Sequence, residues 1–147
     1  MSKEQIKQVR FVDYQDDIVG MMMQMLYLEP QVVQIPVNRY IELDEMGVLK
    51  PFLWLDGDAV KGVALLFVSP SLRNPSVIDA ATDVLWVKPE HRGRSSEFVH
   101  AIKRQLRLLG VDYWTVSSRD SHPIIHFLEK NQFNSLERVY VCRLGEV

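Results

Sequence analysis

The stretch LWVKPEHRGRSSEFVHAIKRQLRLLG, residues 85–110, decides the fold class of this 147-residue chain. Its first residues, Leu85, Trp86 and Val87, end an apolar strand that we expect to begin at Val77 or Ala81, and Pro89 stops that strand. A helix then begins near Ser95 or Ser96, either of which can cap it. Its apolar stripe is Phe98, Ile102, Leu106 and Leu109, and it stops at Gly110. The stretch predicts a strand, a basic turn and an amphipathic helix in succession.

The turn between this strand and helix has the groups of a phosphate site. A helix start presents N–H groups without intrahelical partners and a partial positive charge. Two arginines beside it add charge and forked donors. We expect the anion to meet Arg92, Gly93, Arg94, Ser95 and Ser96. Lys103, Arg104 and Arg107 could meet further phosphate, but a solvated helix face is the favoured interpretation of those three.

Working outward, the remaining patterns predict an α+β domain with a mixed sheet. Asp56-Gly57-Asp58 indicates a tight hairpin between strands at residues 51–55 and 60–68. Further strands are expected at residues 8–12, 111–116 and 136–144. Further helices are expected at residues 37–46 and 123–130, and from Asp16 until Pro30 forbids continuation. No linker or repeat interrupts the chain, so residues 1–147 are predicted to form a single domain.

Composition excludes several classes of function. Hydrophobic residues make up 47% of the chain, enough for one buried core, and the net charge of -2 gives no global field for nucleic acid or an anionic membrane. The longest apolar runs are far too short to span a bilayer, and the polar N-terminus lacks a secretory signal, so we expect a cytoplasmic protein. Cys142, the single cysteine, is expected to pack in a strand. The His and carboxylate spacings match no metal-ligand motif.

Together, the strand, the Val-x-Pro-Glu-x-Arg-Gly turn and the helix resemble the acetyl-CoA motif of the GNAT superfamily. The resemblance extends to the hairpin at residues 56–62 and to the end of the chain, where residues 127–133 are similar to the family's last helix and the turn after it. The overall pattern is most similar to the small acetyltransferase-like proteins of tailed bacteriophages, which would place the protein in a host cytoplasm.

The resemblance implies a GNAT fold with a mostly antiparallel sheet and a splayed central strand pair, and acetyl-CoA as cosubstrate. Leu85, Trp86 and Val87 would align the thioester, and Val87 would polarise its carbonyl. Two places where the family has glycine in the turn are Ser95 and Glu97 here. The Glu97 carboxylate would repel a pyrophosphate by about 1 kcal/mol at contact distance in water, unless it turns outward.

Acyl transfer to an amine also needs a base and an acid. Asp83 is the leading base candidate, although it is equally well explained as part of the polar face of a strand; Asp79 is a second candidate and Glu90 a poorer one. The family's acid is a tyrosine on the last helix, and its position corresponds to Leu128. Substitutes for this acid are Ser121, His122, His126 and Tyr140. The favoured interpretation of His122 is a helix cap, and that of His126 is a surface position on the helix.

We therefore expect an acetyltransferase that acts on an amine of a small molecule or a protein. The alternative is a GNAT-fold binding or structural protein without catalysis, because Glu97, Leu128 and Gln132 replace residues that the family favours. Nucleic-acid binding through the basic turn is disfavoured by the net charge. A homodimer through the final strand is possible, and no motif identifies the acceptor.

Overall fold

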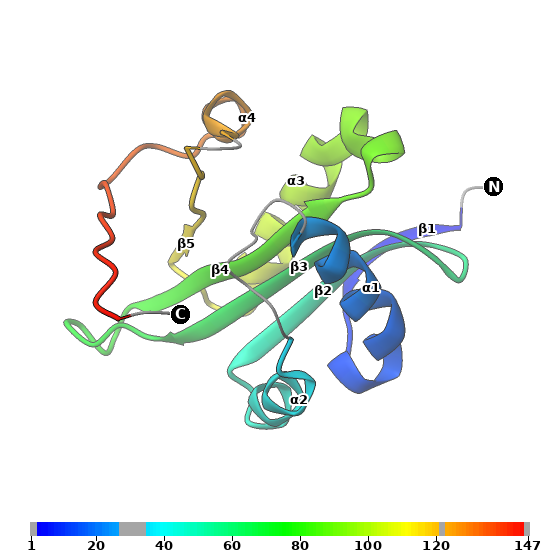
Figure 1. Ribbon diagram of the computed structural model, residues 1–147, viewed down its shortest axis with the longest axis horizontal. Coiled ribbons are helices and arrows are strands. Elements are labelled where there is room, and N and C mark those ends of the chain that lie inside the picture. Colours follow the sequence, from blue (N-terminus) through cyan, green and yellow to red (C-terminus); the bar gives the residue numbers. More distant parts are fainter. Residues whose placement is uncertain (1–2, 27–34, 121–122, 146–147) are drawn as a thin grey trace. The chain divides into compact units, whose positions relative to one another are not determined.

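The structure is a computed structural model that describes residues 3–26, 35–120 and 123–145 (Figure 1). The chain divides into two compact units, Met1–Ser117 and Ser118–Val147, and each is considered by itself. In the first unit the order is β1 (Glu4–Gln8), the 3-10 helix η1 (Phe11–Tyr14), α1 (Gln15–Leu26), α2 (Val37–Glu45), β2 (Leu49–Asp56), β3 (Ala59–Pro70), β4 (Ile78–Val87), the 3-10 helix η2 (Pro89–Arg94), α3 (Ser95–Leu108) and β5 (Tyr113–Thr115). The second unit contains α4 (Ile125–Lys130).

The five strands form one mixed sheet in the order β1-β2-β3-β4-β5. The pairs from β1 to β4 are antiparallel, whereas β5 runs parallel to β4. The hairpin between β2 and β3 turns at Gly57, whose φ of 62° lies in the left-handed region that glycine adopts without strain. The predicted α+β fold with a mostly antiparallel mixed sheet is confirmed.

Helices cover both faces of the sheet in the first unit (Figure 1). On one face, Ile18, Met21 and Met22 of α1 pack with Leu53, Leu65 and Val84, and Tyr40 and Ile41 of α2 join this cluster. On the other face, Phe98, Ile102 and Leu106 of α3 pack with alternate residues of the same strands, including Phe52, Ala64 and Leu66. The central strands β2 and β3 are buried on both sides, so they are nearly continuous hydrophobic runs.

Two β-bulges interrupt the ladder and re-aim polar side chains. The register shifts at Trp54/Leu55, where Lys61 of β3 has no Cα partner in β2, and again at Leu65/Leu66, where Asp83 is the extra residue of β4. A bulge places two consecutive residues on one face of a sheet. Lys61 and Asp83 are therefore directed by backbone geometry that the alternation of apolar residues does not reveal.

Some sequence-based expectations are wrong in detail. The first strand is Glu4–Gln8 instead of residues 8–12, because Phe11 turns into the core in the 3-10 helix η1. The helix α3 begins at Ser95 as predicted, but no side chain caps it, and Leu109 lies outside the buried stripe with 46% of its surface exposed.

The predicted final strand is also wrong. The described residues after α4 form no regular structure, and Leu136, Val139, Val141 and Cys142 are exposed. A strand needs a neighbouring strand to satisfy its main-chain groups, and among the described residues the second unit provides none. Cys142 therefore does not pack in a strand, and the single-domain organisation of residues 1–147 stays a prediction.

Candidate functional site

The central feature of the site is an open edge on β4. Strand β5 pairs with β4 only from Asp79 to Ala81, although β4 continues to Val87. The next residue, Thr82, contacts β5 only through its side chain: its hydroxyl donates to the Thr115 carbonyl at 2.8 Å and accepts from the Trp114 indole N–H at 2.8 Å. From Thr82 to Val87 this edge has no strand partner among the described residues. The predicted splayed strand pair is therefore present.

The main-chain groups of Val87 point to this open edge. The Lys88 N–H donates to the Lys61 carbonyl of β3 at 2.9 Å. Consecutive residues of an extended chain direct their N–H groups to opposite sides, so the N–H groups of Val87 and Leu85 face away from β3. The Val87 carbonyl on that side accepts a hydrogen bond from Arg92 Nε at 3.0 Å. The open edge thus presents two amides, two residues apart.

Trp86 connects the strand, the turn and α1. Its ring lies under the Arg92 guanidinium, with the Arg92 Cζ atom 4.5 Å from the ring centroid. Its indole N–H donates to Gln24 Oε1 of α1 at 3.3 Å. The structure therefore brings together three residues that the sequence predicted, Trp86, Val87 and Arg92. Gln24 was missed, because a single glutamine among methionines gives no pattern that ties α1 to β4.

The turn that follows has the shape and charge to hold an anion. Residues Pro89–Arg94 form the 3-10 helix η2, with His91, Arg92 and Arg94 in its last turn, and α3 starts directly after it. A methyl group added at Gly93 would meet no atom within 4 Å, so the space in front of this residue is open. N–H groups at the start of α3, open space and basic side chains fit the pyrophosphate of an acyl-CoA.

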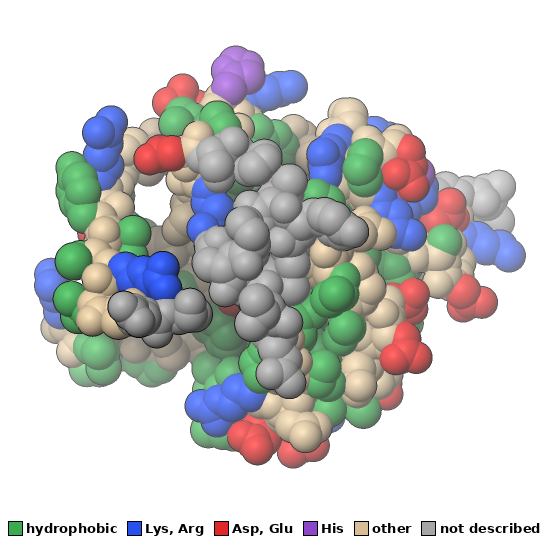
Figure 2. Space-filling view, viewed as in Figure 1, with side chains coloured by type: hydrophobic (Ala, Val, Ile, Leu, Met, Phe, Trp, Pro, Cys, Tyr) green, Lys and Arg blue, Asp and Glu red, His purple; other side chains and the backbone are tan. Residues whose placement is uncertain are grey.

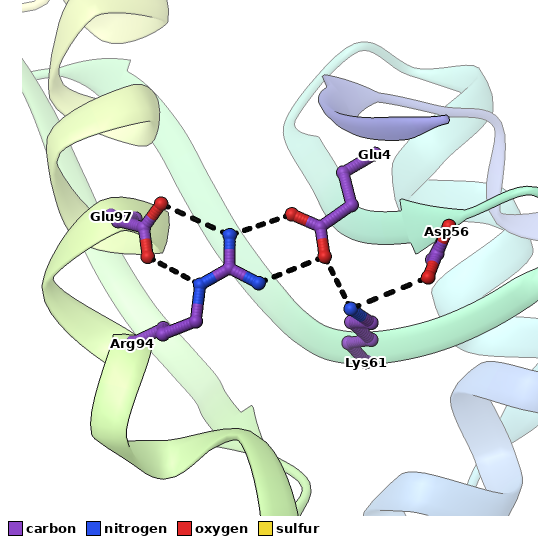
Figure 3. Close-up of polar contacts among 5 residues, drawn as sticks. All are labelled: Glu4, Asp56, Lys61, Arg94 and Glu97. Atoms are coloured by element: carbon purple, nitrogen blue, oxygen red, sulfur yellow. Dashed lines mark hydrogen bonds and ion pairs between the residues drawn. The ribbon is translucent and has the colours of Figure 1, made fainter. Parts of the chain in front are cut away.

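Arg94, however, is held by two carboxylates (Figure 3). Its Nε donates to Glu97 at 2.6 Å, and its Nη1 and Nη2 atoms donate to both oxygens of Glu4 at 2.9 and 2.7 Å. Its guanidinium also lies over the Trp54 ring, 5.3 Å from the centroid. The Glu97 carboxylate is consequently turned toward Arg94. These contacts tie β1 to the beginning of α3.

Lys61 extends this network on the other side of Glu4 (Figure 3). Its ammonium group donates to Glu4 and lies 3.4 Å from Asp56 Oδ2. Hydrogen bonds from Arg94 and Lys61 lower the pKa of Glu4 to about 2, and the bond to Arg94 lowers the pKa of Glu97. In return, the bond to Glu4 raises the pKa of Lys61. These shifts keep Glu4, Glu97 and Lys61 charged at neutral pH.

A second polar contact lies on the face of the sheet that α1 and α2 cover. The Tyr40 hydroxyl of α2 donates to Asp83 Oδ2 at 2.5 Å. The pKa of the Tyr40 phenol is raised above its ordinary range, chiefly by burial and secondly by the hydrogen bond to Asp83. Asp83 is the predicted base, whereas no sequence pattern singles out Tyr40 as its partner. The two residues are 43 positions apart, so no local pattern joins them.

The other candidate residues lie elsewhere. Asp79 pairs with Tyr113 where β4 and β5 are still joined, and Glu90 is exposed on η2. In the second unit His126 and Tyr140 are exposed and Leu128 is buried. Ser121 and His122 lie outside the described residues. In α3, Lys103 is partly buried, whereas Arg104 and Arg107 are exposed as on a solvated face.

Acetyltransferases of known structure share this fold. An aminoglycoside acetyltransferase from an uncultured soil metagenomic sample, solved with sisomicin, matches with a TM-score of 0.77 and 13% identity over 98% of this chain and 97% of its own. A predicted acetyltransferase from Clostridium acetobutylicum, solved with acetyl-CoA, matches with a TM-score of 0.73 and 9% identity over 95% and 96%. Ribosomal-protein-alanine N-acetyltransferase from Brucella melitensis biovar Abortus 2308 matches with a TM-score of 0.70 and 11% identity over 97% of this chain and 99% of its own. These matches confirm the predicted acetyltransferase-type fold.

Sequence comparison adds no assignment, because no protein-family model and no curated protein matches the chain. Among the described residues, no group of three or more His, Cys, Asp or Glu side chains could hold a metal ion. None of the helices in the described part of the chain is long and apolar enough to cross a membrane.

Proposed function

We propose that this protein is an acyltransferase that moves an acetyl group from acetyl-CoA to an amine. The observation that carries the proposal is the open edge of β4, which ends at a basic turn and the start of a helix. A strand edge with free amides suits an extended thioester arm, and the turn suits its pyrophosphate. The cosubstrate would supply an acyl carbon that an amine can attack.

Each part of the site has an assigned task in this proposal. Arg92, Gly93, Arg94, Ser95 and Ser96 would bind the pyrophosphate. Leu85, Trp86 and Val87 would align the thioester, and the Val87 amide, which faces the open edge, would polarise its carbonyl. Asp83 would accept the proton of the amine. Tyr140 remains the acid candidate that the sequence offers from the second unit.

The nature of the acceptor is part of the proposal. Among the proteins of similar fold, one is described as acting on aminoglycosides and another on a ribosomal-protein alanine, and both groups of acceptors carry amines. A small molecule or a protein with a primary amine is therefore the proposed acceptor class. The proposed compartment is a cytoplasm, that of a host cell if the protein is encoded by a phage, and a homodimer remains a prediction.

Binding of acetyl-CoA tests the proposal directly. Acetyl-CoA should raise the melting temperature, because a ligand that binds only the folded state stabilises it. Arg92→Glu should abolish that rise by placing a carboxylate where the phosphate charge must lie. Arg73→Glu is the matched control, because Arg73 lies in the exposed loop between β3 and β4. No change in melting temperature at millimolar acetyl-CoA would refute the proposal.

The second candidate is a protein of this fold that binds a ligand or a partner without catalysis. Two observations favour it: Arg94 is already paired with two carboxylates, and Leu128 puts a buried leucine at the family's tyrosine position. Incubation with acetyl-CoA and a broad panel of amines and peptides separates the two candidates. An acetylated product detected by mass spectrometry would exclude the second one.

A further inference from the structure

We propose that Tyr40 and Asp83 act as one acid–base pair, in which Asp83 takes a proton from the attacking amine and Tyr40 gives a proton to the departing thiolate. This inference rests on the proposed function and assigns a catalytic role to Tyr40 of α2. The carbon–nitrogen bond forms, the carbon–sulfur bond breaks, and the amine proton reaches the sulfur through Asp83 and Tyr40. No other reactant is needed, because one proton is lost by nitrogen and one is gained by sulfur.

The backbone of β4 aims Asp83 at α2. Val84 pairs with Leu65 and Thr82 pairs with Leu66, so the bulge leaves Asp83 without a partner in the ladder. Val84 and Tyr40 belong to the same hydrophobic cluster, which places Asp83 and Val84 on one face although they are consecutive. Thr82 on the other side of the bulge bonds to Trp114, which belongs to the opposite cluster. Bulges of this kind commonly orient side chains at active sites.

Tyr40 is held from the opposite side of the contact. Its ring stacks on Phe11, with centroids 5.5 Å apart and planes 8° from parallel, and Phe11 is completely buried. The Phe11 N–H donates to Asp44 of α2 at 2.8 Å, so η1 and α2 are joined at this point. Basic and acidic side chains lie near one another in the region of α2 (Figure 2). Within α2, Arg39 and Glu42, both exposed, form an ion pair at 3.2 Å. The inner face of α2 thus holds the phenol in a fixed place.

The pair lies close to one of the two free amides of the open edge. Asp83 precedes Leu85 by two residues and Val87 by four, which corresponds to about 7 Å and about 13 Å along a strand. Proton transfer requires hydrogen-bond distance or one intervening water. The pair can therefore serve a reaction beside the Leu85 amide more readily than one beside Val87. The inference therefore places the thioester carbonyl at the Leu85 amide, in place of the Val87 amide named in the proposed function.

Charge fixes the order of the two proton transfers. While Asp83 is ionised, the half-buried Tyr40 phenol stays protonated and donates to the carboxylate, because partial burial and the nearby negative charge both oppose a phenolate. Once Asp83 has accepted the amine proton, this opposing charge disappears. The Tyr40 hydroxyl can then pass its proton to the thiolate and recover one from Asp83. The base acts first and the acid second.

Kinetics of single and double variants test the pair. With acetyl-CoA and three probe amines, sisomicin, a lysine-containing peptide and hydroxylamine, we expect Asp83→Asn to lower kcat by about 10²–10⁴-fold and Tyr40→Phe by at least about 10-fold. The double variant should be no slower than Asp83→Asn, because the two residues act as a unit. Hydroxylamine should partly rescue Asp83→Asn, since it is largely unprotonated at neutral pH, but not Tyr40→Phe. The control is Tyr14→Phe, another partly buried tyrosine packed on the same core cluster.

A measurement without substrate tests the contact itself. The ultraviolet titration of Tyr40, obtained as the difference between the wild type and Tyr40→Phe, should move to lower pH in Asp83→Asn. An unchanged titration would overturn the pair, and so would equal kcat values for Tyr40→Phe and Tyr14→Phe in an enzyme that turns over. If acetyl-CoA binds but no probe amine reacts, the pair is also rejected while the acyl-CoA site stands. If acetyl-CoA does not bind at all, the proposed function fails and the pair with it.

Discussion

Glu97 is the residue at which the proposed phosphate site is most open to a quantitative test. Its carboxylate lies beside the turn that would hold the pyrophosphate, and it is paired with Arg94 at 2.6 Å. Glu97→Gln keeps the shape of the side chain and removes its charge. It also leaves Arg94 with Glu4 as its remaining ionic partner in the network. The substitution should therefore tighten acetyl-CoA binding.

The size of the effect follows from charge and distance. Two unit charges at contact distance in water interact by about 1 kcal/mol, which is about fivefold in Kd. The side chain of Glu97 is 55% exposed, so the value for water applies in preference to that for a dry site. The lost ion pair with Arg94 is an exposed helix contact and should change the free energy of unfolding by less than about 0.5 kcal/mol.

Isothermal titration calorimetry with acetyl-CoA measures the effect, at low salt and again at high salt. The fivefold gain should shrink at high salt, because exposed charges are screened. Glu45→Gln, an exposed carboxylate at the end of α2, is the control and should leave Kd unchanged. Equal or weaker binding by Glu97→Gln at low salt would refute the reasoning, since it would mean that the carboxylate positions Arg94 without repelling the phosphate.

Three predictions concern stability. Phe98→Ala removes a fully buried ring that stacks on Trp54, and it should lower the free energy of unfolding in urea by about 3–5 kcal/mol, whereas Leu108→Ala on the exposed side of α3 should change it by less than about 0.5 kcal/mol. Gln132 has a φ of 63°, a conformation that is strained for residues other than glycine. Gln132→Gly should therefore raise the free energy of unfolding, measured by thermal denaturation, by about 1 kcal/mol, and a lower free energy of unfolding would contradict this reasoning. Because the pKa of Glu4 falls from 4.5 to about 2 in the folded state, its stabilising effect is complete above pH 4.5 and is lost as the pH falls toward 2. Urea unfolding of Glu4→Gln should therefore differ from the wild type at pH 6 and converge with it near pH 2; a constant difference would argue against the network.

The parts of the fold that the sequence predicted are those coded by local pattern. Gly57 identified the hairpin, and the spacing of Phe98, Ile102 and Leu106 identified α3. The final strand failed for a physical reason: residues 136–144 have β-prone side chains, but pairing depends on a neighbouring strand, which composition does not report. The first strand failed because Phe11, which looked like a strand residue, belongs to a 3-10 turn.

The candidate site was predictable where one continuous segment builds it. Trp86, Val87 and Arg92 lie within seven residues of one another, and the structure brings them into contact. The partners from distant segments were not predictable. Tyr40 of α2 reaches Asp83 at a bulge of β4, 43 positions further along the chain, and Glu4 reaches Arg94 from the beginning of the chain. The sequence pattern contains neither the bulge nor the distance between these groups.

The open edge of β4 has a consequence for how such proteins diverge. Amide and carbonyl groups are the same in every residue except proline, so a site built on a strand edge survives almost any change of side chain. Substitutions at Leu85 and Val87 alter packing but leave the exposed N–H groups where they are. Chains that share only 9–13% of their residues with this one can therefore keep the same fold. In this architecture the side chains of the site can be replaced, while the main-chain donors of the strand edge remain.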